Sequence, residues 1–156
     1  MAKSTFSGPI VSNNGFISAG SDNIVNITAE TTLTFNSHAG RIIEINDADG
    51  AVTLPSIVSA ELGAKYTFFI GTDATDLDIK TDGTDKYVGS LTVAITNDAE
   101  KTFIPGATND VISLNGGTQG GDKFSYLEIT ALATAEYLVQ GVLIGSGTLA
   151  TPFADS

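Results

Sequence analysis

The sequence predicts an all-β fold, an antiparallel β-sandwich of jelly-roll type preceded by an extended N-terminal arm. Three observations predict it. After about residue 22, short runs rich in Val, Ile, Thr, Phe and Tyr alternate between apolar and polar residues. Asn-Gly and Asp-Gly pairs recur between the runs, where turns need residues that tolerate positive φ. No long helical period is present. The chain therefore divides into an arm, residues 1–22, and a single sandwich domain, residues 23–156.

The first runs of the domain predict strands with one apolar face each. Residues 31–35 place Leu33 and Phe35 on one face. Residues 41–46 and 51–54 flank the turn sequence DADG and predict a hairpin. The inward side chains of this hairpin are predicted to be Ile43, Ile45, Val52 and Leu54.

The middle of the chain predicts one central and one outer strand. Residues 64–71 are apolar on both faces, which places this strand centrally in a sheet or against a subunit. In residues 76–80, Leu77 and Ile79 alternate with aspartates, which is typical of an outer, half-exposed strand. Residues 55–65 are the only helix candidate and predict one short turn at most.

The remaining predicted strands show the same alternation and no fixed-period repeat. Without such a repeat, a β-solenoid is disfavoured. These strands are residues 91–95, 101–105, 110–114, 124–132 and 136–144.

Charge and composition exclude several classes of partner. The formal net charge is −11 and the few Lys and Arg residues are scattered, so we expect no binding to nucleic acid or to anionic membranes. No long apolar run follows Lys3, so we expect neither a secretory signal nor a membrane span. The absence of cysteine excludes a disulfide framework and a thiolate metal site.

No reactive constellation stands out in the sequence. The acidic stretch at residues 71–87 offers hard oxygen ligands, but its spacing does not match an EF-hand loop, so we interpret it as solvated and leave a bound cation open as the alternative. His38 is the sole histidine and lacks a nucleophile elbow or a nearby acid partner. The glycine-rich residues 115–122 lack the lysine of a phosphate loop. We therefore predict no metal, no cofactor and no enzymatic activity; a β-sandwich hydrolase would need an acid pair that the sequence does not single out.

The two ends of the chain carry the candidate contact residues. Residues 1–20 hold only isolated apolar residues and cannot close a core, so they form an arm on another protein, a disordered tail or an internal first strand. At the other end, apolar residues beyond the last regular strand either cross an oligomer axis or fold back on their own subunit. The arm residues are Phe6, Pro9, Ile10, Val11, Phe16 and Ile17, and the candidate oligomer contacts are Leu149, Pro152 and Phe153.

Three stretches of the sequence resemble small virion structural proteins of marine tailed bacteriophages, of the head-decoration or cement type. They are AKSTFSGPI with NNGF, LPSIVSAELGAKYTFFIGTDATDLDIKTDG, and EYLVQGVLIGSGTLATPFADS. The resemblance implies a protein on the outer capsid surface of the virion that binds the major capsid protein and itself, as a homotrimer. The arm would then add a strand to a capsid sheet edge. The segments VTLPS…G…YTFFI and DVISL…GD…LEIT…EYLVQG, which overlap these stretches, also resemble modules of phage tail-fibre and tail-spike proteins, so a tail-associated or receptor-binding module is the alternative.

Overall fold

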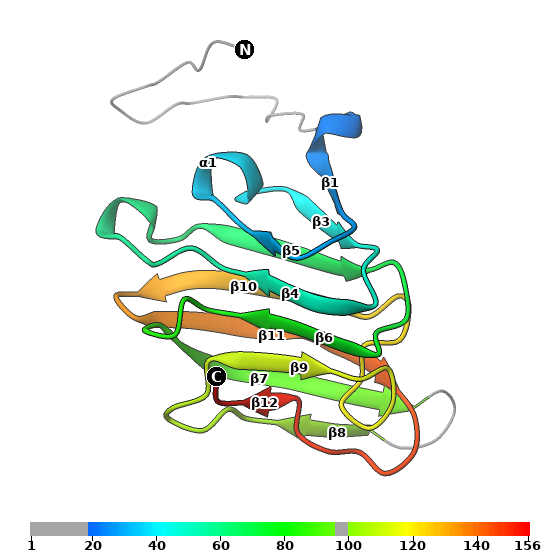
Figure 1. Ribbon diagram of the computed structural model, residues 1–156. Coiled ribbons are helices and arrows are strands. Elements are labelled where there is room, and N and C mark those ends of the chain that lie inside the picture. Colours follow the sequence, from blue (N-terminus) through cyan, green and yellow to red (C-terminus); the bar gives the residue numbers. More distant parts are fainter. Residues whose placement is uncertain (1–18, 96–99) are drawn as a thin grey trace, which may run out of the picture.

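The computed structural model describes residues 19–95 and 100–156, which form two β-sheets packed face to face around one hydrophobic core (Figure 1). The six predicted arm residues lie outside the described residues. The seven-stranded sheet has the order β1-β3-β5-β10-β11-β7-β8, and the five-stranded sheet has the order β12-β9-β6-β4-β2. Predominantly β structure in two packed layers is thus confirmed.

The strands of the seven-stranded sheet are β1 (Ile24–Ile27), β3 (Ile42–Ile45), β5 (Lys65–Ile70), β7 (Lys86–Ile95), β8 (Glu100–Phe103), β10 (Tyr126–Ala133) and β11 (Glu136–Gly145). Those of the five-stranded sheet are β2 (Thr31–Thr32), β4 (Asp49–Thr53), β6 (Asp76–Lys80), β9 (Val111–Leu114) and β12 (Phe153–Ala154). The helical elements are η1 (Ser21–Asn23), α1 (Phe35–His38) and η2 (Ser59–Glu61).

The sheets are mixed, so the predicted antiparallel jelly roll is wrong. Five of the ten pairings between described strands are parallel: β1 with β3, β3 with β5, β2 with β4, β4 with β6, and β7 with β11. The other five are antiparallel. Parallel partners need a crossover rather than a tight turn, and here the crossover runs through the opposite sheet.

The first six strands form three coils of a two-sided solenoid. The chain passes from one sheet to the other at every step, and each return lies parallel to the previous strand of that sheet. Because β3 and β4 lie in different sheets, the predicted hairpin around DADG is wrong. The expectation that the chain forms no β-solenoid is also wrong for these six strands. We call residues 24–80 the coil region.

Unequal coil lengths explain why no repeat is visible in the sequence. Ile24 lies opposite Ile42, 18 positions later, whereas Ile42 lies opposite Thr67, 25 positions later. A search for a fixed period relies on equal spacing. The loops absorb the difference in length, so the structural repeat leaves no constant sequence period.

The core confirms most of the predicted inward residues. Ile43, Ile45, Val52, Leu54, Leu77 and Ile79 are all buried, as predicted. Strand β5 is central, as predicted, and contributes Tyr66, Phe68 and Ile70 to the core. Buried tyrosine hydroxyls need partners. Tyr87 donates to the Ile79 carbonyl over 3.1 Å, and Tyr137 donates to the Pro55 carbonyl over 2.7 Å.

Two local predictions change, and a third is confirmed. Of residues 31–35, only the first two form a strand, because Phe35 begins α1, although Leu33 is buried. Strand β6 lies in the middle of the five-stranded sheet, so its aspartates meet solvent on the sheet's outer face rather than at an edge. Residues 55–65 contain one short 3-10 turn, as predicted.

The C-terminal segment is fixed to its own subunit. Strand β12 pairs with β9, and the Phe153 ring lies 6.4 Å from that of Tyr87. The buried Asp110 carboxylate accepts hydrogen bonds from the backbone N–H of Ser156 over 2.8 Å and from its hydroxyl over 2.9 Å, and it pairs with Lys86 over 3.2 Å. The last residues therefore close the open side of β9.

Replacing Asp110 with Asn should weaken this attachment in a pH-dependent way. Burial acts to raise the pKa of Asp110, but the hydrogen bonds from Ser156 and the charge of Lys86 outweigh it and hold the pKa below its ordinary value. A lowered folded-state pKa contributes stability above the unfolded-state pKa of about 3.9, and this stability is lost as the pH falls through the folded pKa. Urea unfolding should show Asp110→Asn less stable by about 1–3 kcal/mol at pH 7, with the difference shrinking below about pH 4.

The control for this experiment is Asp76→Asn, an exposed carboxylate, which should change stability by no more than about 0.5 kcal/mol. A constant difference between wild type and Asp110→Asn from pH 7 to pH 3 would contradict the ionic role of Asp110.

Candidate interaction surface

The outer face of the seven-stranded sheet carries a row of apolar side chains. Strand register places Phe69 opposite Tyr126, and Tyr126 opposite Val142, so the three lie side by side across β5, β10 and β11. Their sequence neighbours Phe68, Leu127 and Leu143 are fully buried on the other side of the sheet. Alternation along a strand therefore turns Phe69, Tyr126 and Val142 outward.

Phe124 extends this row and is held in an unusual backbone conformation. Its φ is +75°, which non-glycine residues with bulky side chains rarely adopt. Its side chain is 63% exposed, and its ring lies 5.9 Å from that of Phe69. The Phe124 N–H donates to the Ile70 carbonyl over 2.9 Å, which ties this residue to the end of β5. Such strain persists where the surroundings impose it, and it is concentrated at functional sites.

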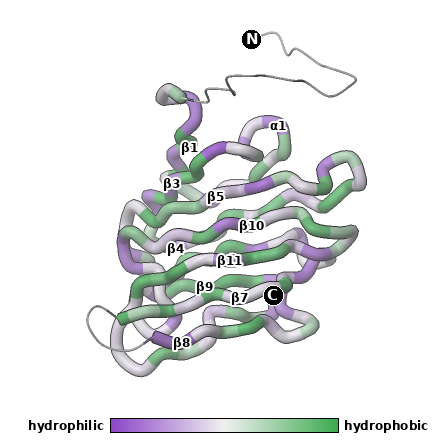
Figure 2. The backbone as a smooth tube through the Cα atoms, turned by 180° about the vertical axis from the view of Figure 1, so that it is seen from behind, coloured by the Kyte–Doolittle hydropathy of each residue, from purple (hydrophilic) through white to green (hydrophobic). Residues whose placement is uncertain are grey.

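Further exposed apolar residues lie on the same face of the sheet. Ile24 and Ile42 are directly opposite each other on β1 and β3, and both are about half exposed. Figure 2 shows the molecule from the side of the seven-stranded sheet. We call this set the apolar face: Ile24, Ile42, Phe69, Phe124, Tyr126, Leu132 and Val142.

The charges on the apolar face largely compensate one another. Lys65 pairs with Glu128 over 2.9 Å, and Gln140 also donates to this glutamate over 3.2 Å. This pair points outward near the middle of the face, beside Thr67 and Thr130. Glu44 of β3 also points outward, directly opposite Phe69, and the Lys123 ammonium lies 5.5 Å from the centroid of the Phe124 ring. This part of an otherwise strongly acidic protein is therefore close to neutral.

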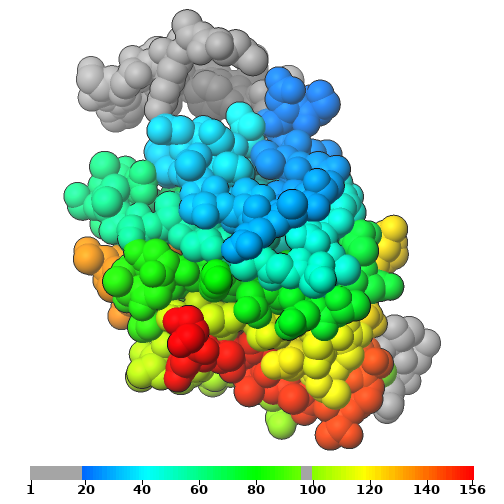
Figure 3. All heavy atoms as spheres, in the orientation of Figure 1, coloured from blue at the N-terminus to red at the C-terminus, as the bar shows by residue number. Residues whose placement is uncertain are grey.

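The outer face of the five-stranded sheet has the opposite character. Asp49 lies directly opposite Asp76, and Asp78 follows on the same side of β6. Among the described residues, no exposed large hydrophobic side chain belongs to a strand of this sheet. The C-terminal residues, red in Figure 3, lie on this side of the molecule. Like charges placed directly opposite each other are tolerated where water screens them. This acidic face is suited to solvent.

The residues that the sequence offers as possible metal ligands or as a catalytic base make hydrogen bonds within the fold or lie on its acidic face. Besides Asp76 and Asp78, the acidic stretch supplies Asp82 and Asp85 to the turn before β7, where they accept hydrogen bonds from the segment after β4. Among the residues that the structure describes, no group of three or more His, Asp or Glu could hold a metal ion. The His38 ring accepts from the backbone N–H of Thr34 over 2.9 Å, which fixes the ring to the start of its own short helix.

The predicted C-terminal contact residues belong mostly to the subunit core. Pro152 and Phe153 are buried, and Leu149 is partly buried against the core. Only Leu149 retains accessible surface for an oligomer contact, and that contact stays a prediction. The sequence analysis missed Phe124, Tyr126 and Val142. One part of the sequence did indicate the apolar face. Residues 64–71 form a strand that is apolar on both of its sides, and this strand contributes Phe69.

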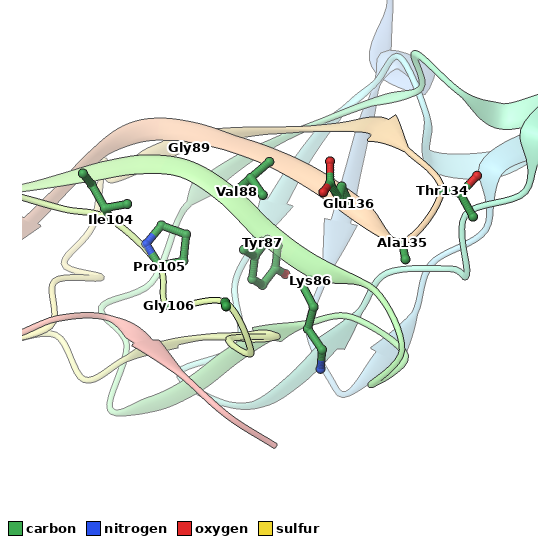
Figure 4. Close-up of a pocket in the computed structure, with 11 residues that line it drawn as sticks. Lys86, Tyr87, Val88, Gly89, Ile104, Pro105, Gly106, Thr134, Ala135 and Glu136 are labelled. Atoms are coloured by element: carbon green, nitrogen blue, oxygen red, sulfur yellow. The ribbon is translucent and has the colours of Figure 1, made fainter.

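A pocket of about 450 Å³ opens at one end of the seven-stranded sheet, next to β8. The loop after β8 and the β10–β11 turn form its two sides, with Val88 and Tyr87 of β7 between them (Figure 4). Its walls are mainly apolar, with Lys86 and Glu136 as the charged residues. Lys86 is held by Asp110 and by the Gly83 carbonyl, so its ammonium group is already paired.

No protein-family model matches the chain, and no curated protein or solved structure matches it either. None of the described helices is long and apolar enough to cross a membrane.

Replacing Phe124 with Gly should remove the exposed ring at little cost in stability. Glycine adopts positive φ freely, so the relief of strain offsets the lost contact with Phe69, and we expect the free energy of unfolding to change by no more than about 1 kcal/mol. The comparison is Phe68→Ala, which removes a fully buried ring and should cost about 3–5 kcal/mol. Urea unfolding of both variants measures the two losses in stability. Equal losses would mean that Phe124 is needed for folding rather than for binding.

Proposed function

We propose that this protein is a non-enzymatic head-decoration protein of a tailed bacteriophage, which binds the outside of the capsid and stabilises the lattice of the major capsid protein. The observation that carries this proposal is the contrast between the two sheets. One outer face is apolar and close to neutral, and the other is acidic. A protein that lies on a surface needs such a pair of faces, one for contact and one for solvent.

The apolar face is the proposed contact with the lattice. Contiguous exposed apolar patches on soluble proteins mark interaction sites, and aromatic residues contribute strongly at interfaces. Phe69 and Tyr126 lie opposite each other on paired strands, and Phe124, in the turn before β10, packs against Phe69. The acidic face then points away from the capsid and keeps neighbouring particles apart by charge repulsion.

Stabilisation of the capsid follows from mass action. A protein that binds only the assembled, expanded lattice stabilises that lattice by its binding free energy. A homotrimer seated on a symmetric lattice would add avidity, since several copies bind together. The chemistry required is reversible association, and no bond is made or broken.

Capsid binding by charge-matched variants tests the proposal. Val142→Asp places a carboxylate in the apolar face, whereas Thr53→Asp places one on the outer side of β4 in the acidic face. Purified expanded capsids are mixed with each protein, and copies bound per capsid are measured after sedimentation. We expect saturable binding in proportion to the capsid protein, about tenfold or more weaker for Val142→Asp and unchanged for Thr53→Asp.

Equal binding by the two variants would refute the apolar face as the contact. If wild type fails to bind capsids but binds purified tails, the tail-associated alternative replaces the proposal.

A further inference from the structure

One carboxylate within the apolar face has no partner in the fold. Glu44 is half-buried on β3 and points outward, because its neighbours Ile43 and Ile45 are buried in the core. Among the residues that the structure describes, no hydrogen bond or ion pair reaches its carboxylate. Strand register places Glu44 directly opposite Phe69 on β5. This charge therefore lies within the surface that the proposed function assigns to the capsid.

Two other charged sites on the apolar face already have contacts. Lys65 pairs with Glu128 over 2.9 Å, and the Lys123 ammonium lies over the Phe124 ring, 5.5 Å from its centroid. A partner that covers these groups leaves their contacts in place. A partner that covers Glu44 would bury a negative charge that the protein itself does not compensate, and burial of an unpaired charge opposes binding. Such a partner therefore has to supply a positive charge.

A second oxygen acceptor lies next to Glu44. A Cβ atom at Gly71 would clash with Asn46 Oδ1 and would lie 3.1 Å from Glu44 Oε1, so the two oxygens lie around the same point. Asn46 Nδ2 donates to Asn26 Oδ1 over 3.0 Å, and Asn46 Oδ1 accepts from the Thr72 hydroxyl over 3.3 Å. These bonds fix the orientation of the amide. Because an amide oxygen has two lone pairs, Asn46 Oδ1 can accept one more hydrogen bond.

An arginine side chain fits this group of acceptors better than a lysine. Its planar guanidinium presents several N–H donors in a fixed fork, which suits a carboxylate and an adjacent amide oxygen together. It also stacks on aromatic rings and loses its hydration more readily than an ammonium. Phe69 supplies such a ring, one strand spacing of about 4.8 Å from β3. An ammonium would use the charge of Glu44 but would gain less from the second acceptor and the ring.

We propose that Glu44 and Asn46 bind an arginine side chain of the major capsid protein when the apolar face lies on the lattice. The guanidinium donates to the Glu44 carboxylate and to Asn46 Oδ1, and its flat side lies against the Phe69 ring. The inference rests on the proposed function, because it names the partner group that meets the apolar face. Apolar contacts supply most of the buried surface, while this ion pair fixes the position of the face on the lattice.

Capsid sedimentation with Glu44→Gln tests the proposal, because glutamine keeps the size of the side chain and removes its charge. We expect this variant to bind expanded capsids about tenfold or more weakly than wild type, since the capsid arginine would be buried without its counter-charge. The matched control is Asp76→Asn, which removes one charge from the acidic face and should bind like wild type. Circular dichroism confirms the fold of both variants.

Two outcomes of this experiment would overturn the proposal. Unchanged binding by Glu44→Gln would mean that the carboxylate lies outside the contact. Tighter binding would mean that the carboxylate is buried on the lattice without a cation, because removing an unpaired buried charge favours association.

Chemical modification of the capsids identifies the partner side chain. Phenylglyoxal blocks arginine, whereas acetylation removes the charge of lysine. On capsids treated with phenylglyoxal, the difference in binding between wild type and Glu44→Gln should disappear, and on acetylated capsids it should remain. The opposite pattern would overturn the assignment to arginine. Electron microscopy confirms that the treated capsids are intact.

Val142→Asp separates a failure of this inference from a failure of the proposed function. If Val142→Asp weakens capsid binding and Glu44→Gln does not, the apolar face is the contact and only the arginine site is wrong. If wild type does not bind capsids, both proposals are overturned.

Discussion

The register of the seven-stranded sheet is the constraint on which the rest of the structure depends. In each strand, alternate residues point into the core, and a slip by one position would exchange the two sets. The buried Phe68, Leu127 and Leu143 fix this register, since moving any of them outward would expose a large apolar side chain. The same register brings Phe69, Tyr126 and Val142 together on the outside. The same strand register therefore determines both the core and the apolar face.

Alternation predicted burial well and topology poorly, for a physical reason. Whether Ile43 or Leu77 points inward depends on its neighbours in the chain, and the sequence predicted both correctly. Which strands become partners depends on the path between them. DADG looked like a hairpin turn, but the chain there crosses from β3 to β4 in the other sheet. Local turn chemistry does not distinguish a hairpin from such a crossing, and unequal coil lengths hid the repeat.

The candidate surface could be predicted only in part. Residues 64–71 are apolar on both faces, which indicated a contact on each side of β5. Phe124 lies outside every regular strand, and its exposure follows from hydrogen bonds of neighbouring residues to β5 and β11. The pocket likewise combines the β8–β9 loop with the β10–β11 turn, which are separated in the sequence. Contacts of this kind exist only once the fold is known.

The proposed function uses the two outer faces of the molecule in different ways. The apolar face is the proposed contact with the lattice, and the acidic face is the one proposed to meet solvent. Self-association multiplies a weak contact by avidity, which suits a protein whose net charge of −11 otherwise separates its copies. An acidic outer layer and a neutral inner face can then coexist in one small domain.

The most direct test of the central claim is hydroxyl-radical footprinting of the full chain, free and bound to expanded capsids. If the apolar face lies on the lattice, oxidation of Phe124 and Tyr126 should fall several-fold on binding. Val58 and Leu62, which are exposed in the segment after β4, provide the comparison and should react as before. Unchanged oxidation of Phe124 and Tyr126 on capsids that carry the protein would contradict the account.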